Sequence, residues 1–172
     1  LHHPRGVVTV ISPWNYPLSL GAGDTIPALL AGNAVVQKPD NQTALTALYA
    51  RDLVVQAGLP EDLWQIVAGR GSSIGDTLFD VADFVMFTGS TDSGRHVAAE
   101  AGRRLLECSL ELGGKNAMIV LGDADLTRAA EGAVRACFSS SGQLCISIER
   151  LYVAREIHDE FMERFLAQLD SL

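Results

Sequence analysis

The stretch Phe-Val-Met-Phe-Thr-Gly-Ser-Thr-Asp-Ser-Gly, residues 84–94, joins an apolar run to a polar turn. Residues 84–87 are apolar throughout, which is typical of a strand buried on both faces of a parallel sheet. Ser, Thr and Asp at 90–92 favour a helix N-terminus, so a helix is expected over 90–102. The stretch therefore predicts a buried strand that passes through a Gly-Ser pair into a helix.

The same alternation of strand and helix extends through the first 113 residues. Such βαβ units predict the α/β class, with a doubly wound, Rossmann-like parallel sheet. A ligand crevice is expected at the carboxyl ends of its strands. The predicted strands are 7–11, 34–37, 64–67, 84–87 and 105–110, and the predicted helices are 18–31, 43–57, a short one after the glycine-rich turn 68–75, and 90–102.

The pattern changes after Gly113-Gly114, which we interpret as a domain boundary. Residues 1–113 predict a nearly complete sheet of the cofactor-binding type. Residues 114–172 predict the opening elements of a second α/β domain. These elements are strands at 117–121 and 151–154 and helices at 125–138 and 157–169.

Composition limits the classes of function. The chain has 172 residues, is 48% hydrophobic, and carries a net charge of -8 and three cysteines. The sparse, odd set of cysteines fits a reducing compartment, so a cytoplasmic location is expected. The sequence has neither an apolar run long enough to span a membrane nor a visible signal peptide, and the negative charge argues against nucleic acid and membrane partners. None of the four histidines stands at a metal-ligand spacing, so no metal site is expected.

Polar residues follow several predicted strands where the crevice is expected. Lys38 can donate to ribose hydroxyls, although a solvated lysine is the simpler interpretation. Gly89-Ser90 opens a helix whose free N–H groups suit a pyrophosphate, or Ser90 merely caps the helix. Asn15, beside Trp14, offers two N–H donors to a carbonyl oxygen, or it forms an Asx turn before Pro17. The motif Gly69-x-Gly71-x-x-x-Gly75 misses the usual dinucleotide spacing by one residue and is weak evidence.

Two further residues carry possible chemistry. Glu111 leaves an apolar strand toward the crevice, where a carboxylate is costly unless it is solvated or used. Cys145 lies in the polar stretch 139–147, and a lone cysteine is more often a small packing residue than a nucleophile. The residues alone leave both alternatives open.

Six short motifs occur together along the chain. They are Pro13-Trp-Asn-Tyr-Pro17, Lys38-Pro39, Phe87-Thr-Gly-Ser-Thr91, Glu111-Leu-Gly-Gly-Lys115, Asp123-Ala-Asp125 and Gly142-Gln-x-Cys145. Through these motifs and their order, the whole chain resembles the aldehyde dehydrogenase superfamily. The interval from Glu111 to Cys145 is similar to the family's as well.

The resemblance implies catalytic roles for three residues. Cys145 matches the nucleophile that forms a thiohemiacetal and then a thioester. Glu111 matches the general base, and its presence argues against the acylating, CoA-dependent branch. Asn15 matches the side chain of an oxyanion hole that also uses the backbone N–H of Cys145. Cys108 and Cys137 remain packing residues.

The resemblance also implies a nicotinamide cofactor, NADP or NAD. Residues 1–113 then form a partial NAD(P)-binding domain and 114–172 the N-terminal part of a catalytic domain. Many members have a glutamate after Lys-Pro-x that holds the adenosine ribose, and here Asn41 stands in its place, which makes NADP use plausible; neighbouring Asp40 leaves the preference open. The cofactor-binding residues implied are Trp14, Lys38, Asp40, Asn41, Gly89, Ser90 and Leu112.

The expected reaction is oxidation of an aldehyde to a carboxylic acid. Asp24-Thr-Ile-Pro27 and residues 37–42 are similar to bacterial succinate-semialdehyde dehydrogenases, so succinate semialdehyde is a candidate substrate. Some of those enzymes carry an arginine six residues before the cysteine, where this chain has Ser139, and Arg135 is the nearest arginine. The chain is short for the family, so we expect a fragment of a larger, homo-oligomeric enzyme. Two alternatives are a stand-alone dinucleotide-binding module without catalysis and a cysteine hydrolase that pairs Cys145 with a histidine.

Overall fold

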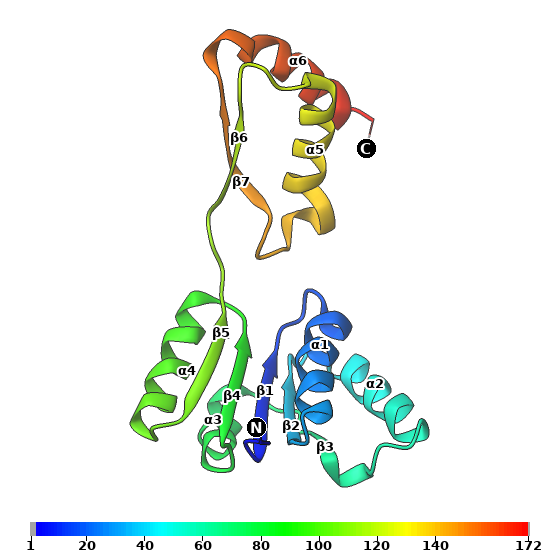
Figure 1. Ribbon diagram of the computed structural model, residues 1–172, viewed down its shortest axis with the longest axis vertical. Coiled ribbons are helices and arrows are strands. Elements are labelled where there is room, and N and C mark those ends of the chain that lie inside the picture. The colour runs from blue at the N-terminus through cyan, green and yellow to red at the C-terminus, as the bar shows by residue number, and fades with distance from the viewer. Residues whose placement is uncertain (1–2, 172) are drawn as a thin grey trace. The chain divides into compact units, whose positions relative to one another are not determined.

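The computed structural model describes residues 3–171 and divides into two compact units (Figure 1). Unit 1 is Leu1–Leu112 and unit 2 is Gly113–Leu172. Each unit has its own sheet and its own hydrophobic core.

Unit 1 is built on a five-stranded sheet with the order β3-β2-β1-β4-β5 (Figure 1). Every neighbouring pair of strands is parallel. The order reverses at β1, because the chain first adds strands on one side of β1 and then on the other. The strands are β1 Val7–Ser12, β2 Ala34–Pro39, β3 Trp64–Ile66, β4 Phe84–Thr88 and β5 Glu107–Glu111.

Helices cover both faces of this sheet, which confirms the predicted doubly wound α/β class. Residues of α1 and α2 pack with Val10, Val35 and Trp64 in one core. Phe79 of α3 and Val97 of α4 belong to the other core. The helices are α1 Pro17–Leu30, α2 Ala44–Gln56, α3 Gly71–Asp80 and α4 Thr91–Arg103, with a 3-10 turn η1 at Glu61–Leu63.

Two predicted boundaries differ from the structure. The strand predicted from residue 105 begins at Glu107, because Leu105 adopts a left-handed conformation with φ 56° in the turn that closes α4. The N–H groups of Leu105 and Leu106 donate to carbonyls of that helix instead. The glycine-rich turn predicted over 68–75 is shorter than expected, because α3 already begins at Gly71.

A buried chain of hydrogen bonds crosses three strands of unit 1. The indole Nε1 of Trp64 donates to Gln37 Oε1 at 3.0 Å, and Gln37 Nε2 donates to Ser12 Oγ at 2.9 Å. Trp64, Gln37 and Ser12 are all buried, with Gln37 only 1% exposed. A buried polar group without a partner is costly, so the Trp64 indole and the Ser12 hydroxyl each depend on the Gln37 amide. The chain of bonds fixes the carboxyl ends of β1 and β2 relative to β3.

Unit 2 pairs a two-stranded parallel sheet with two helices (Figure 1). Its core is centred on the fully buried Phe161, which stacks on Phe165 with ring centroids 5.9 Å apart. Asp125 caps α5 by accepting hydrogen bonds from the N–H groups of Thr127 and Arg128. The elements are β6 Asn116–Val120, α5 Leu126–Phe138, η2 Ser139–Gly142, β7 Ile148–Val153, η3 Arg155–Ile157 and α6 His158–Leu169.

No helix in the described part of the chain has the length and apolar character needed to cross a membrane. Among residues 3–171, His, Cys, Asp and Glu side chains form no group of three or more that could hold a metal ion.

Replacing Gln37 by leucine should destabilise unit 1 by about 3 kcal/mol, because it leaves the Trp64 indole N–H and the Ser12 hydroxyl buried without their partner. Urea unfolding followed by tryptophan fluorescence reports the change, since Trp64 lies inside the core. Gln65→Leu is the matched control: Gln65 is exposed, and its loss should change stability by at most about 0.5 kcal/mol. Equal unfolding midpoints for the two variants would contradict the role given to Gln37.

Candidate active site

A cavity of ≈ 740 Å³ lies at the carboxyl ends of β1, β2 and β4 in unit 1. This is the place where a doubly wound sheet binds its ligand, outside the strand ends and beside the reversal of strand order. The lining residues come from the ends of these strands and from the beginnings of α3 and α4.

Five of the seven predicted cofactor-binding residues line this cavity. They are Trp14, Lys38, Asp40, Gly89 and Ser90. The other two lie elsewhere: Asn41 is exposed outside the cavity lining, and the Leu112 side chain packs on α4, where a Cβ added to Gly94 would lie 2.3 Å from it. The fold therefore brings residues from three separate loops to one place.

Two helix N-termini meet at the cavity. Ser90 caps α4 and accepts a hydrogen bond from the N–H of Ser93 at 3.2 Å. α3 begins at Gly71 without a side-chain cap, so its first N–H groups are not used by a capping side chain. Helix N-termini carry partial positive charge and exposed donors, which suits a pyrophosphate. Sequence reasoning found only the α4 end and underrated the α3 end.

The glycines of α3 keep the cavity wall free of side chains. Gly71 and Gly75 both line the cavity and stand one helical turn apart. A Cβ built on either residue meets no heavy atom within 4 Å, so a side chain at either position would project into open space. Glycine at both positions lets a ligand approach the backbone closely. The motif that missed the usual dinucleotide spacing by one residue supplies both of these glycines.

The cavity wall carries side chains of both charges. Lys38 is half-buried, and its ammonium donates to the carbonyl of Pro39 at 3.1 Å. The Asp40 carboxylate accepts from the N–H of Gln42 at 2.9 Å, which holds it in a turn at the cavity edge. On α4, Arg95 pairs with the Asp92 carboxylate at 2.6 Å and reduces its repulsion of an anion. A cation and a carboxylate thus stand side by side where β2 ends.

Asn15 and Glu111 also belong to unit 1. Asn15 is half-buried in the segment between β1 and α1. Glu111 is the exposed last residue of β5, and its backbone carbonyl accepts from the N–H of Gly89 at 3.0 Å. The pKa of Asp24 on α1 is raised, first by burial and then by the negative charge of Glu111. Glu111 therefore lies at the carboxyl end of β5 and near enough to α1 to act on Asp24.

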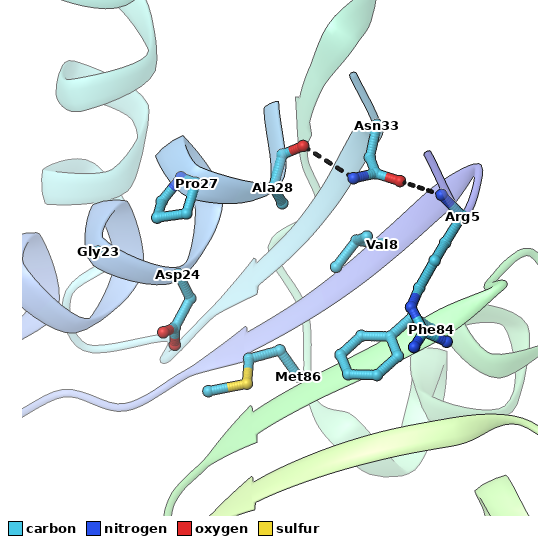
Figure 2. Close-up of a pocket in the computed structure, with 9 residues that line it drawn as sticks. All are labelled: Arg5, Val8, Gly23, Asp24, Pro27, Ala28, Asn33, Phe84 and Met86. Carbon is cyan, nitrogen blue, oxygen red and sulfur yellow. Dashed lines mark hydrogen bonds between the residues drawn. The ribbon is translucent and has the colours of Figure 1, made fainter. Parts of the chain in front are cut away.

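A second hollow lies on the α1 face of the sheet (Figure 2). Its volume is ≈ 310 Å³, and both ends of the motif Asp24-Thr-Ile-Pro27, Asp24 and Pro27, line it. At one end the guanidinium of Arg5 lies 4.8 Å from the ring centroid of Phe84. Asn33 joins this end to α1, accepting from the N–H of Arg5 and donating to the carbonyl of Ala28 (Figure 2). None of the predicted catalytic or cofactor-binding residues lines this hollow.

Cys145 belongs to unit 2 and lies in the loop between α5 and β7. Cys145 is exposed, whereas Cys108 and Cys137 are partly buried. Burial raises the pKa of the Cys137 thiol, which favours the unreactive neutral form. Cys108 packs against the core formed with Val85 and Val97. Cys145 is therefore the most accessible of the three thiols.

The loop before Cys145 holds an unfavourable backbone conformation. Ser140 and Ser141 have φ values of 50° and 57°, and Gly142 follows with φ 74°. The left-handed region costs free energy for residues other than glycine. Such residues stay there only when surrounding contacts hold them, often at functional sites. The hydroxyl of Ser147 supplies one such contact by donating to the carbonyl of Cys137 at the end of α5, 3.0 Å away.

Proteins of similar sequence and solved structures of similar fold identify the family of the chain. The chain is 57% identical over 171 residues to a protein of Mycolicibacterium smegmatis provisionally named succinate-semialdehyde dehydrogenase [NADP(+)], covering 99% of this chain and 33% of that protein. The crystal structure of an aldehyde dehydrogenase from Brucella melitensis biovar abortus 2308 superposes with a TM-score of 0.96 at 38% identity, covering 99% of this chain and 36% of that one. Betaine aldehyde dehydrogenase from Staphylococcus aureus, solved in complex with NAD+, superposes with a TM-score of 0.92 at 35% identity, covering 97% and 34%.

The chain thus spans about a third of the length of these relatives. The sequence profile described as "Aldehyde dehydrogenase family" matches residues 1–172, the whole of the chain. With this match, the 57% identity and the shared fold, the chain belongs to the aldehyde dehydrogenase family.

Proposed function

We propose that this chain supplies the cofactor cavity and the nucleophile of an NAD(P)-dependent enzyme that oxidises an aldehyde to a carboxylic acid. The observation that carries the proposal is the cavity of unit 1, which joins two helix N-termini, two open glycines and Lys38 at the strand ends. Each of these features suits a dinucleotide phosphate. Membership in the aldehyde dehydrogenase family supports the reaction type.

The residues present fit a nicotinamide dinucleotide. In this proposal the N–H groups at the starts of α3 and α4 bind the pyrophosphate, and Lys38 donates to the adenosine ribose. Asp40 lines the same cavity, and its carboxylate would repel a phosphate on the ribose. The bound cofactor supplies the hydride acceptor, and the remaining chemistry belongs to the side chains of the chain.

Cys145 acts as the nucleophile in the first half of the reaction. A free thiol has a pKa of about 8.5, so a base must take its proton for rapid attack at neutral pH. The thiolate adds to the aldehyde carbon, and the carbonyl oxygen becomes an oxyanion. The Asn15 side chain and the N–H of Cys145 stabilise that oxyanion, and losing one such donor costs roughly 10²–10³ in rate.

Glu111 acts as the base. It first accepts the proton of the Cys145 thiol, directly or through a water, and releases that proton to solvent. After oxidation leaves a thioester on Cys145, Glu111 takes a proton from the water that attacks the thioester carbon. The carbon–sulfur bond breaks, the proton on Glu111 passes to the departing thiolate, and the products are the carboxylic acid and the regenerated thiol.

We also propose succinate semialdehyde as the substrate, on the name of the Mycolicibacterium relative. Arg135, the arginine nearest Cys145 in the sequence before it, is ion-paired with Glu131 at 2.7 Å. The relatives include a protein named for betaine aldehyde, a cation, so family membership alone does not select an anionic aldehyde. Comparing kcat/KM for succinate semialdehyde and betaine aldehyde tests the substrate separately from the reaction type.

The cysteine hydrolase would need a histidine that hydrogen-bonds to the Cys145 thiol. Within unit 2, the ring of His158 at the start of α6 is bonded to Asp159 at 2.9 Å instead. A dinucleotide-binding module without catalysis would share the cavity of unit 1. It would not account for an exposed cysteine on a strained loop, and activity measurements separate the two.

Cys145 should be the most reactive thiol in the full-length protein that carries this sequence. Iodoacetamide should label it at least about tenfold faster than Cys108 or Cys137, because it alone is exposed. Cys145→Ser should lower aldehyde-dependent cofactor reduction by about 10³-fold or more, since no nucleophile of comparable strength remains. Peptide mapping and steady-state rates provide the measurements, with Cys137→Ser as control. Near-parent activity in Cys145→Ser would contradict the proposal.

Glu111→Gln should slow thioester hydrolysis more than cofactor reduction, because the amide cannot take a proton from water. Stopped-flow absorbance should then show a burst of reduced cofactor followed by turnover about 10²-fold or more below the parent. Glu107→Gln is the matched control, since Glu107 is also an exposed carboxylate on β5 but pairs with Arg5. Should both variants turn over like the parent, Glu111 is not the base.

Asp40→Asn should shift cofactor preference toward NADP by roughly tenfold. Two unit charges about 4 Å apart interact by roughly 4 kcal/mol at an effective dielectric near 20, and about 1.4 kcal/mol, one factor of ten, is expected to survive solvent exposure. Asn41→Glu is the control, because Asn41 lies outside the cavity lining and should move the preference less. Ratios of kcat/KM for NADP and NAD give the answer. A larger shift from Asn41→Glu would place residue 41, and not residue 40, at the ribose.

A further inference from the structure

We propose that Asn116 is a positioning residue for Cys145: its side-chain amide holds the backbone of the nucleophile loop against β6. The inference rests on the proposed function, in which Cys145 is the nucleophile. Asn116 is the first residue of β6, far from Cys145 in sequence, and both belong to unit 2.

The contacts are direct. Asn116 Nδ2 donates to the carbonyl oxygen of Cys145 at 2.6 Å and to the carbonyl oxygen of Ser147 at 3.0 Å. A side-chain amide has two N–H donors, and two carbonyl acceptors are available to use both of them. The two acceptors flank Ile146, so one side chain restrains three consecutive residues of the loop.

A β-bulge sets the position of this side chain. Asn116 pairs with Ile148, but the next residue, Ala117, pairs with Arg150, so Glu149 is the extra residue on β7. Bulges bend a strand locally and redirect side chains, and they are frequent beside active sites. Glu149 forms an ion pair with Lys115, the residue before Asn116. Lys115, just before β6, is therefore tied to β7, and Asn116, the first residue of β6, is tied to the residues just before β7.

The loop requires these hydrogen bonds because its backbone conformation is unfavourable. Three successive residues, Ser140 to Gly142, have positive φ values. Ser147 anchors the loop to the end of α5 through its hydroxyl, and Asn116 anchors it to β6 through two carbonyls. With the carbonyl of Cys145 held, the backbone at that residue is restrained, and with it the direction of the Cα–Cβ bond that carries the thiol.

The consequence concerns the rate of attack. A nucleophile held in its reactive geometry avoids a large entropic cost, and a displacement of about 1 Å can cost about 10² in rate. The bonded amide also draws electron density from the Cys145 carbonyl oxygen, whose partial negative charge opposes a thiolate close by. Loss of the amide should therefore reduce both the fraction of well-placed thiol and the ease of forming its thiolate.

The test uses Asn116→Ala and Asn116→Asp in the full-length protein that carries this sequence. The aspartate has the shape of asparagine but lacks the N–H donors. Asp125→Ala is the matched control: it removes two side-chain to backbone hydrogen bonds from the same unit, at the opposite end of α5 from the loop. Melting temperature, cofactor Kd, the burst rate of cofactor reduction and the pH profile of Cys145 alkylation are measured for all variants.

Both Asn116 variants should slow the burst by about tenfold or more and move the midpoint of Cys145 alkylation to higher pH. Their cofactor Kd should stay within about twofold of the parent. Asp125→Ala should lower the melting temperature without either change. A burst rate and alkylation midpoint like the parent's in Asn116→Ala, or equal changes in Asp125→Ala, would overturn the inference. If Cys145→Ser itself remains active, the proposed function fails instead, so the two failures are distinguishable.

Discussion

The amide of Gln37 is the interaction on which the carboxyl edge of the unit 1 sheet depends. It is buried between Trp64 and Ser12 and satisfies both, so the three strands that carry these residues share one hydrogen-bonded connection beyond their backbone ladders. Ser12 also lines the cavity, and Gln37 immediately precedes Lys38 in β2. Core packing and cavity shape are therefore joined: a change that displaces Gln37 displaces the residues proposed to hold the cofactor.

The sequence predicted the sheet well because the strands of unit 1 are short apolar runs separated by strong helix signals. Each strand and helix of unit 1 lies within a few residues of its predicted place. The exceptions have local causes. Leu105 looks like the first residue of a strand, yet the turn that closes α4 requires a left-handed residue there and leaves its side chain 93% exposed. No pattern of apolar residues reveals that requirement.

The candidate site was predictable where a side chain carries the chemistry, and less so where the backbone does. Lys38 was identified from its place at the end of a strand and Asp40 from the resemblance to the family, and both line the cavity. Gly71 and Gly75 were undervalued because glycine contributes by leaving space, which becomes visible only when the neighbouring atoms are known. Asn116 escaped notice for a different reason. Its partners are carbonyls near residue 145, and a hydrogen bond over such a sequence separation has no local signature.

The three cysteines show why residue type alone could not settle the question of the nucleophile. Cys137 lies in the last turn of α5, where partial burial raises its pKa and favours the neutral thiol, while Cys145 lies exposed in the loop that follows. An exposed loop without further contacts would be free to change conformation. Ser140, Ser141 and Gly142 have left-handed backbone angles, and the two serines would lower their energy by leaving them. The hydroxyl of Ser147 and the amide of Asn116 oppose that relaxation from two sides, one through α5 and one through β6. A thiol can then be accessible to substrate and still be held in place, because the restraint acts on its backbone and leaves its sulfur unobstructed.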